Sequence, residues 1–409
     1  MRVAVVGTGI SGLVVAHLLH RDHAITVFEA KDYIGGHTHT VDVDLDGERL
    51  AVDTGFIVYN ERNYPNFTRL LRRLGVATQP STMSFSVRMT DPELEYNGST
   101  FRQLFAQRRN LIRPRFYRML ADIVRFNKSA PVAISNGAAD LTLGQYIERD
   151  GYSPDFVDRY LVPMGAAIWS SPASRVLEMP VQFFVRFFEN HGMLTINDRP
   201  QWRTIVGGSS RYVERLTAPF LDRIRLNNPV CTIRRADDHV LVNDECFDEV
   251  VVACHSDQAL NMLADPSDAE REILGAIPYQ ENQVVLHTDT TVLPRRRRAW
   301  GAWNYHVSGE PEGSVGVTYN MNMLQSLTAS RTVCVTLNDV EAIDPDLIID
   351  RYTYFHPLFT PEGIEAQRRR AEISGRRRTH YCGAYWRNGF HEDGVVSALA
   401  VGRAFGASL

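Results

Sequence analysis

The first thirty residues constrain the fold of this 409-residue chain more than any other segment. Two short β-branched runs, 2–6 (RVAVV) and 24–28 (AITVF), flank an apolar helical stretch. The motif G-x-G-x-x-G follows the first run and consists of Gly7, Gly9 and Gly12. Between a strand and a helix, such glycines allow a tight turn, close approach of backbone to a pyrophosphate and close helix–strand packing. The segment predicts an α/β, Rossmann-like domain that binds an adenine dinucleotide.

The residues around this turn are candidates for contact with the dinucleotide. The helix begins near Ile10 and Ser11, where unpaired backbone N–H groups can take phosphate charge. The second strand ends at Glu29, followed by Ala30. Because an acid about twenty residues beyond the glycine turn accepts hydrogen bonds from a ribose, we expect Glu29 to bind the adenosine part.

The next segment favours a flavin over a nicotinamide. A nicotinamide domain would continue directly into another β-α-β unit. Here paired glycines follow the second strand, and a strand-like run at 52–60 is broken by a further glycine. A glycine-rich segment that returns along the pyrophosphate suits an elongated, enclosed FAD. We therefore expect cofactor contacts from Gly35, Gly36, His37, Gly55, Phe56 and Ile57.

In these residues the chain resembles the flavin amine oxidase superfamily, which includes protoporphyrinogen oxidase and the phytoene desaturases. The resemblance implies a discontinuous Rossmann-like FAD-binding domain joined to an α+β substrate domain. Members of the superfamily usually carry Arg after the paired glycines, whereas this chain has His37. Because histidine is mostly neutral at pH 7, this departure removes a fixed positive charge from the phosphates.

The carboxyl end carries a second cofactor signal. A strand-like THYCGAYW at 379–386 precedes GFHEDG at 389–394 and a helix of small residues. In the superfamily the corresponding helix start contacts the ribityl chain and directs its positive end at the flavin. The resemblance implies contacts from Gly383, Glu392, Asp393 and Val395. It also implies that the backbone near Val230, between strand-like runs, meets the adenine.

The chain divides into two discontinuous domains. We assign 1–80, 200–270 and 371–409 to the FAD-binding domain, and 81–199 and 271–370 to the substrate domain. Helical patterns occur in the first insertion at 101–126 and 180–189. The second insertion has four evenly spaced strand-like runs, which predict an antiparallel sheet; they are 283–288, 301–306, 314–319 and 332–337.

Composition indicates a cytoplasmic globular protein. The chain is 44% hydrophobic and 22% charged, and no apolar run approaches the roughly 18 residues of a membrane span. A first strand at residue 2 leaves no room for a signal peptide ahead of it. Five cysteines lack C-x-x-C spacing, so we expect neither a disulfide nor a metal site.

The basic residues are almost all arginine. Only Lys31 and Lys128 are lysine among 44 basic residues. Amine oxidases of the superfamily hold a water against flavin N5 with a lysine. Neither lysine is placed for that task, since one lies beside the adenosine end and the other in an expected surface helix. This argues against amine oxidation of that type.

Arginines gather at 101–126, where seven of them accompany one acid, Asp122, and alternate with apolar residues. Such a segment can lie on the anionic inner face of a membrane. The alternative is a solvated helix face with structural arginines. The runs 295–298, 368–370 and 376–378 could extend the basic surface. Nucleic acid is not an expected partner, because the net charge is −4 and no nucleic-acid motif is present.

The middle of the chain has a more specific resemblance. It rests on six long strings, at 151–172, 187–194, 199–216, 302–306, 318–327 and 355–362. They are similar to the flavoprotein module at the amino end of plant cyclopropane fatty acid synthases. Stand-alone bacterial flavoproteins associated with fatty-acid methyltransferases are equally similar. This implies a lipid acyl-chain substrate, unsaturated or methyl-branched and free or phospholipid-linked, and a methyltransferase as a partner.

Dehydrogenation of such a chain requires its carbon within about 3.5 Å of flavin N5, in a site that excludes water. The residues that we expect at the flavin face are Tyr59, Trp169, Tyr305, Asn322, His356 and Trp386. Tyr305 or His356 could accept or relay a proton, and Asn322 could hold a water. Each could equally be a packed aromatic or a satisfied core residue.

Three other functions stay open at this point. The superfamily suggests an amine oxidase. Flavin chemistry without net redox change suggests a double-bond isomerase. The association with methyltransferases suggests a non-catalytic flavoprotein that delivers substrate.

Overall fold

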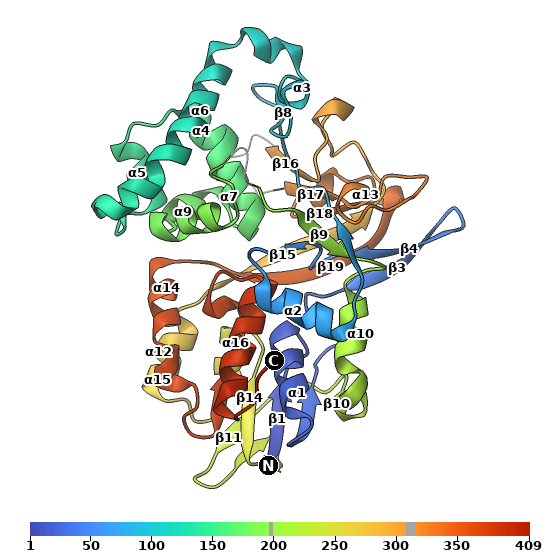
Figure 1. Ribbon diagram of the computed structural model, residues 1–409, viewed down its shortest axis with the longest axis vertical. Coiled ribbons are helices and arrows are strands. Elements are labelled where there is room, and N and C mark those ends of the chain that lie inside the picture. Colours follow the sequence, from blue (N-terminus) through green and yellow to red (C-terminus); the bar gives the residue numbers. More distant parts are fainter. Residues whose placement is uncertain (196–198, 308–315) are drawn as a thin grey trace.

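The computed structural model describes residues 1–195, 199–307 and 316–409, and it has two layers (Figure 1). The lower layer is built on a five-stranded parallel sheet. Its strands, in spatial order, are β10 (Ile224–Arg225), β2 (Ala24–Phe28), β1 (Arg2–Val6), β14 (Glu249–Val252) and β20 (Thr379–Tyr381). Segments from the start, middle and end of the chain therefore share one sheet, as the Rossmann-like prediction requires.

The two ends of the chain pack together through two helices. In α1 (Ile10–Leu19), nine of ten residues are buried, and α16 (His391–Ala404) lies against it. A Cβ on Gly394 would lie 2.7 Å from Ile10 Cγ2, and one on Gly402 would lie 2.7 Å from Leu18 Cδ1. Only glycine permits this approach. It brings the start of α16 beside the glycine turn that follows β1.

The upper layer contains a seven-stranded sheet. Its order is β19 (Ile348–Pro357), β15 (Tyr279–His287), β18 (Cys334–Leu337), β17 (Gly316–Asn320), β16 (Trp303–Val307), β7 (Phe85–Met89) and β8 (Leu94–Asn97). All neighbours pair antiparallel except β16 and β7, which are parallel. The antiparallel pairing predicted for the second insertion is confirmed for β15, β18, β17 and β16, but the whole sheet is mixed. The reason is that β7 and β8 come from the first insertion and extend a sheet formed by the second.

Helices from the first insertion cover this sheet. They are α3 (Phe101–Leu104), α4 (Pro114–Ala133), α5 (Leu143–Arg149), α6 (Pro154–Phe156), α7 (Val162–Trp169), α8 (Ala173–Glu178) and α9 (Val181–Asn190). The helical pattern at 101–126 is divided between α3, a 3-10 turn at Arg108–Ile112, and α4. Proline explains the division, since Pro114 has no N–H to continue a helix but suits the first position of a new one. No helix of the described ranges is long and apolar enough to cross a membrane.

Smaller elements join the layers. They include the ribbon β3 (Thr40–Leu45) and β4 (Glu48–Asp53), the sheet β5 (Tyr59–Asn60), β9 (Trp202–Ile205) and β6 (Thr78–Pro80), α2 (Pro65–Leu74), and α10 (Ser210–Thr217). Asp53 at the end of β4 is fully buried and accepts hydrogen bonds from Thr40 Oγ1 (2.6 Å), Ser209 Oγ (2.7 Å) and Gln325 Nε2 (2.9 Å). Burial raises the pKa of Asp53 to about 6.

The remaining elements cover the edges of the lower sheet and the far side of the upper one. They are β11 (Ile233–Arg235), β12 (Val240–Val242), β13 (Glu245–Phe247), α11 (Ser256–Met262), α12 (Asp268–Gly275), α13 (Met321–Leu324), α14 (Pro361–Arg368) and α15 (Arg370–Ile373).

Candidate cofactor and substrate site

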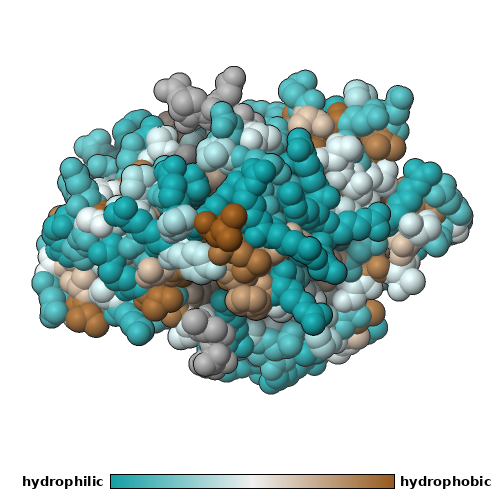
Figure 2. All heavy atoms as spheres, turned by 90° about the horizontal axis from the view of Figure 1, so that it is seen from above, coloured by the Kyte–Doolittle hydropathy of each residue, from teal (hydrophilic) through white to brown (hydrophobic). Residues whose placement is uncertain are grey.

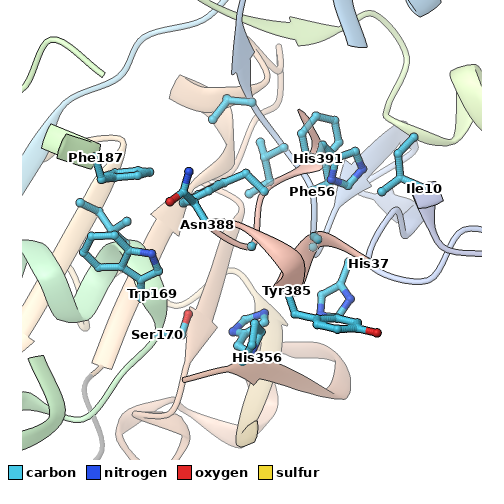
Figure 3. Close-up of a pocket in the computed structure, with 18 of the residues that line it drawn as sticks. Ile10, His37, Phe56, Trp169, Ser170, Phe187, His356, Tyr385, Asn388 and His391 are labelled. Carbon is cyan, nitrogen blue, oxygen red and sulfur yellow. The ribbon is translucent and has the colours of Figure 1, made fainter. Parts of the chain in front are cut away.

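A cavity of about 1290 Å³ extends from the glycine turn after β1 into the helices of the upper layer. This exceeds the roughly 300–1,000 Å³ of a typical ligand pocket, so it has room for a large cofactor and a second molecule. Figure 3 shows Ile10, His37, Phe56 and His391 on one side and Trp169, Ser170 and Phe187 on the other. Tyr385 lies beside His37, and His356 and Asn388 lie between the two groups.

The three glycines of the turn have different surroundings. A Cβ on Gly12 would lie 2.0 Å from Gly7 O, and one on Gly7 would lie 2.9 Å from Ala253 O. A Cβ on Gly9 would meet no atom within 4 Å. Gly7 and Gly12 therefore serve packing, whereas Gly9 leaves space open where a pyrophosphate would approach the backbone.

The paired glycines close over this turn. Gly36 has φ +63°, and a Cβ there would lie 3.0 Å from Gly9 Cα. A Cβ on Gly55 would lie 2.2 Å from His37 O. Backbone crosses backbone at both points, which explains glycine at each position.

Glu29 is held rigidly at the same end. It accepts hydrogen bonds from the backbone N–H groups of Thr8 (3.0 Å) and Lys31 (2.9 Å), and from the Thr8 hydroxyl. The predicted cofactor residues that line the cavity are Gly7, Gly9, Ile10, Ser11, Glu29, Ala30, Gly35, Gly36, His37, Gly55, Phe56, Ile57, Val230 and Gly383. Residues from five separate segments thus meet in one place.

Three predicted residues at the start of α16, and Gly12, lie outside the cavity lining. Glu392 accepts hydrogen bonds from Asn66 Nδ2 (2.6 Å) and Phe67 N (2.9 Å), which caps α2. Asp393 accepts one from Phe390 N (3.0 Å) and so caps its own helix. Val395 is fully buried in the core. The side chains of Glu392, Asp393 and Val395 therefore have structural roles, and contact of this helix start with the cofactor stays a prediction.

His391 is the residue of α16 that reaches the cavity, and the sequence prediction missed it. Its Nε2 lies 3.0 Å from Thr38 Oγ1 and 3.1 Å from Tyr212 OH, and its ring stacks on Phe56 at 3.5 Å between centroids. Burial lowers its pKa well below the ordinary value, so the ring is neutral. The motif GFHEDG contains His391, but the prediction relied on the two acidic residues of the motif.

Three more neutral histidines surround the centre of the cavity. The ring of His37 lies 5.2 Å from that of His356 and 6.3 Å from that of His255. Burial lowers the pKa of His37 and His356 to about 3, and that of His255 to about 4. His37 Nε2 is buried without a partner among the described residues, so it can meet a cofactor atom. The negative charge of a phosphate would be stabilised here by backbone N–H groups and by the start of α1, and not by a cationic side chain.

These features fit FAD. Open space at Gly9, the start of α1 without a side-chain cap and the unpartnered His37 nitrogen suit a pyrophosphate. The neutral aromatic and imidazole rings further along suit a flat ring system. When bound, FAD would supply the two-electron redox chemistry of the site.

Two of the six predicted flavin-face residues, Trp169 and His356, line the cavity. Asn282 Nδ2 donates to His356 Nδ1 at 3.2 Å, which leaves the proton on Nε2. His356 has no nitrogen left to accept a proton, because Nδ1 already accepts from Asn282 and Nε2 carries the proton. His356 can therefore act as a hydrogen-bond donor, but not as the predicted proton acceptor.

The other four lie outside the cavity lining. Tyr59 packs edge-on against Phe67 in the lower core, at 5.4 Å between ring centroids. Asn322 accepts from Val333 N (2.7 Å) and donates to Arg331 O (3.1 Å), which links a turn. Tyr305 and Trp386 are buried in hydrophobic clusters. The structural alternative therefore holds for Tyr59, Asn322, Tyr305 and Trp386, because each is committed to its own local packing.

His191 is a candidate proton acceptor that the sequence prediction missed, although it lies within 187–194, one of the six strings that carry the resemblance. Its Nδ1 lies 2.9 Å from Phe187 O. Because a carbonyl can only accept, Nδ1 carries the proton and Nε2 is left as an acceptor. Burial lowers the pKa of His191 to about 4, so the ring is neutral.

The upper part of the cavity is apolar. Its lining includes Met83, Phe85, Leu104, Leu120, Ile123, Met164, Ile168, Trp169, Phe187, Met193, Trp303 and Phe359. Among the described residues, the charged side chains of the whole lining are Glu29, at the nucleotide end, and Arg199. Lys31 donates to Tyr33 OH at 3.0 Å, and Lys128 is exposed on α4, so neither lysine lines the cavity. This agrees with the prediction that no lysine is placed at the reaction centre.

Comparisons with known proteins point the same way. The family model described as flavin containing amine oxidoreductase matches residues 10–404. Amine oxidase [flavin-containing] A of Canis lupus familiaris is 25% identical over 302 residues, which cover 69% of this chain and 53% of that protein. The chain spans about half the length of the curated relatives it matches.

Two solved structures share the fold. Cyclohexylamine oxidase from Brevibacterium oxydans has a TM-score of 0.70 at 15% identity, with 99% of each chain covered. A CLA-producing fatty acid isomerase from P. acnes has a TM-score of 0.71 at 17% identity, covering 99% of this chain and 98% of the other. The predicted two-domain α/β fold is confirmed.

Proposed function

Since this chain belongs to the flavin-containing amine oxidoreductase family, we propose that it is an FAD-dependent oxidoreductase whose substrate is a fatty acyl chain. The acyl chain would be unsaturated or methyl-branched, and free or linked to a phospholipid. The proposed reaction is a dehydrogenation of the desaturase type.

The apolar upper cavity is the observation that supports this substrate. Each methylene transferred from water into such a lining contributes about 0.8 kcal/mol, so a long acyl chain binds through its length alone. An ammonium group would lose its hydration there. No carboxylate of the described lining lies outside the nucleotide end to compensate it.

The proposed reaction balances on two electrons. The acyl chain would lose one hydrogen with its electron pair, for which bound FAD would be the acceptor, and one proton, and it would gain a carbon–carbon double bond. Trp169 and Phe187 would hold the chain across the apolar walls, where water is excluded. His191 Nε2, left as an acceptor by the Phe187 carbonyl, is our candidate to receive the proton.

Double-bond isomerisation is a second candidate. A CLA-producing fatty acid isomerase shares this fold, so the architecture can accommodate fatty acid chemistry of that kind. The same apolar cavity would serve both reactions. They differ in outcome, because an isomerase returns the flavin to its oxidised state in each turnover.

The specific resemblance to the flavoprotein module of plant cyclopropane fatty acid synthases stays a prediction. It supports a methyl-branched chain as substrate and a fatty-acid methyltransferase as a partner. The methyltransferase would act first, since it makes the branched chain that this enzyme would consume.

Anaerobic mixing of the FAD-loaded enzyme with candidate substrates tests the proposal. We expect an unsaturated or methyl-branched fatty acid to bleach the flavin absorbance and to lose two mass units by mass spectrometry. Bleaching by amines alone would identify an amine oxidase. A shifted double bond with oxidised flavin would identify an isomerase. No reaction at all, with a methyltransferase co-purifying, would indicate a non-catalytic partner.

A further inference from the structure

One end of the upper layer combines exposed apolar side chains with arginines. This arginine end comprises α3, the 3-10 turn at 108–112, the first turns of α4 and the loop 295–298. In Figure 1 it lies at the opposite end of the molecule from β1. Exposed fractions are 72% for Phe101 and 81% for Ile112, and Leu111 and Tyr117 are also exposed. Figure 2 views this end and shows hydrophobic residues surrounded by hydrophilic ones.

Buried polar residues of β8 bring the two basic segments together. Glu95, only 1% exposed, accepts hydrogen bonds from Arg295 N (2.7 Å) and Arg296 Nη1 (2.8 Å). Asn97 Nδ2 donates to Trp300 O at 2.9 Å. These contacts hold the loop 295–298 beside α3 and the 3-10 turn. A second basic surface thus joins the one predicted at 101–126.

A cleft of about 490 Å³ lies between these segments. It is lined by Glu93, Ala106, Gln107, Arg108, Arg109, Arg296, Arg297 and Arg298. Arg296 pairs with Glu93 and Glu95, at 3.3 and 2.8 Å. The other four arginines are exposed and form no ion pair within the described ranges. Their forked guanidinium groups suit phosphate oxygens.

The structure also removes two arginines from the predicted surface set. Arg113 Nη1 donates to Glu93 O (2.9 Å) and Asn110 Oδ1 (3.1 Å). Arg115 pairs with Asp155 at 2.9 Å. Both are committed to the fold, and the arginines of the cleft that are left for a partner are Arg108, Arg109, Arg297 and Arg298.

The large cavity opens beside the same surface. Its lining reaches Gly98 and Ser99, which are exposed, and Val124 on α4, which is 44% exposed. Leu104 of α3 continues the lining inward. Gly98 and Ser99 are separated from the exposed Phe101 by a single residue, Thr100. An opening with apolar walls therefore adjoins the apolar and basic surface.

We propose that the arginine end docks on an anionic bilayer. The cleft between Arg108, Arg109, Arg297 and Arg298 takes a lipid phosphate, Phe101 and Ile112 enter the interface, and the opening near Ser99 faces the acyl chains. Charge complementarity selects the anionic surface, and the exposed apolar groups select a lipid partner. Passage of an acyl chain through this opening rests on the proposed function, whereas docking does not.

Flotation of the FAD-loaded enzyme with vesicles tests docking. We expect binding to phosphatidylcholine vesicles that contain about one-third phosphatidylglycerol, weakened by salt, and little binding to pure phosphatidylcholine. The variant R108Q/R109Q/R297Q/R298Q should lose roughly a hundredfold to a thousandfold in affinity, since each surface arginine contributes about 1 kcal/mol.

A matched control removes four charges elsewhere. Arg21, Arg234, Arg271 and Arg376 are exposed on the FAD-binding side, and R21Q/R234Q/R271Q/R376Q should bind as the wild type does. F101S/I112S tests the apolar contribution separately and should bind roughly tenfold more weakly. Equal binding by the docking and control variants, or no flotation of the wild type, would overturn the proposal.

A second readout separates docking from substrate identity. We expect the docking variant to reduce its flavin normally with detergent-dispersed oleic acid but slowly with dioleoyl phosphatidylglycerol vesicles. If neither lipid form reduces the flavin while flotation depends on the four arginines, the proposed substrate fails and docking stands. Equal rates of docking variant and wild type on vesicles would overturn entry through this opening.

Discussion

The nucleotide end and the substrate end of the cavity are built in different ways. At the nucleotide end, backbone and glycine set the shape, and contacts such as those of Gly12 with Gly7 and of Gly55 with His37 are closer than any side chain allows. At the substrate end, apolar side chains from α4, α7, α9 and the upper sheet form the walls. The first end can accept one kind of ligand only, whereas the second can change its substrate by exchanging side chains.

Gly9→Val should have the largest effect. The added Cβ meets no protein atom within 4 Å, so we expect the fold to form, but the side chain fills the space of the pyrophosphate. We expect FAD affinity to fall by roughly a hundredfold or more. Flavin absorbance after gel filtration measures this. Gly98→Val is the matched control, because its Cβ is equally free of contacts at the substrate end. Equal flavin loss in both variants would contradict the distinction.

His191→Gln tests the substrate end for proton transfer. Gln keeps a polar group but no basic nitrogen, so we expect flavin reduction by a fatty acid to slow by roughly a hundredfold. FAD content should stay normal. Stopped-flow absorbance measures the rate, and His356→Gln serves as comparison with a smaller loss. A rate equal to the wild type in His191→Gln would remove this residue from the chemistry.

Met164→Glu tests the apolar wall. Met164 lines the cavity on α7, and a carboxylate there must be desolvated when an acyl chain binds. We expect kcat/KM for a fatty acid to fall by roughly thirtyfold, and Met164→Leu to change it little. Steady-state kinetics with a fatty acid and an amine provide the test. Improved fatty acid turnover in Met164→Glu would argue against an acyl substrate.

Asp53→Asn tests the junction of the two layers and should have the smallest effect. The folded pKa of about 6 exceeds the ordinary 3.8, so the folded protein keeps a proton that the unfolded chain releases. Raising the pH from about 4 to 6 therefore lowers the contribution of Asp53 to stability, by about 1.4 kcal/mol per pH unit at most. Urea unfolding across this range should show a flatter pH dependence in Asp53→Asn. An unchanged slope would mean that Asp53 does not titrate there.

The sequence predicted the nucleotide end of the cavity better than the substrate end. The glycine turn, Glu29 and the paired glycines were recognisable because each role depends on neighbours within a few residues. The start of α16 shows the limit of prediction from neighbouring residues. Its motif marked the right segment, but whether Glu392 or His391 faces the cavity depends on the rotation of α16 against α1 and α2. Asn322 and Tyr305 were misplaced for a similar reason, since long-range packing determines which way each side chain points.

The sequence by itself determined the Rossmann-like half, the FAD cofactor and the shortage of lysine at the reaction centre. These depend on local backbone geometry and on composition, which no distant contact changes. Only the tertiary structure decided which histidines face the cavity, and that loop 295–298 lies beside the arginines of 101–118. Such contacts depend on buried groups like Glu95, whose partners lie some two hundred residues away in the chain.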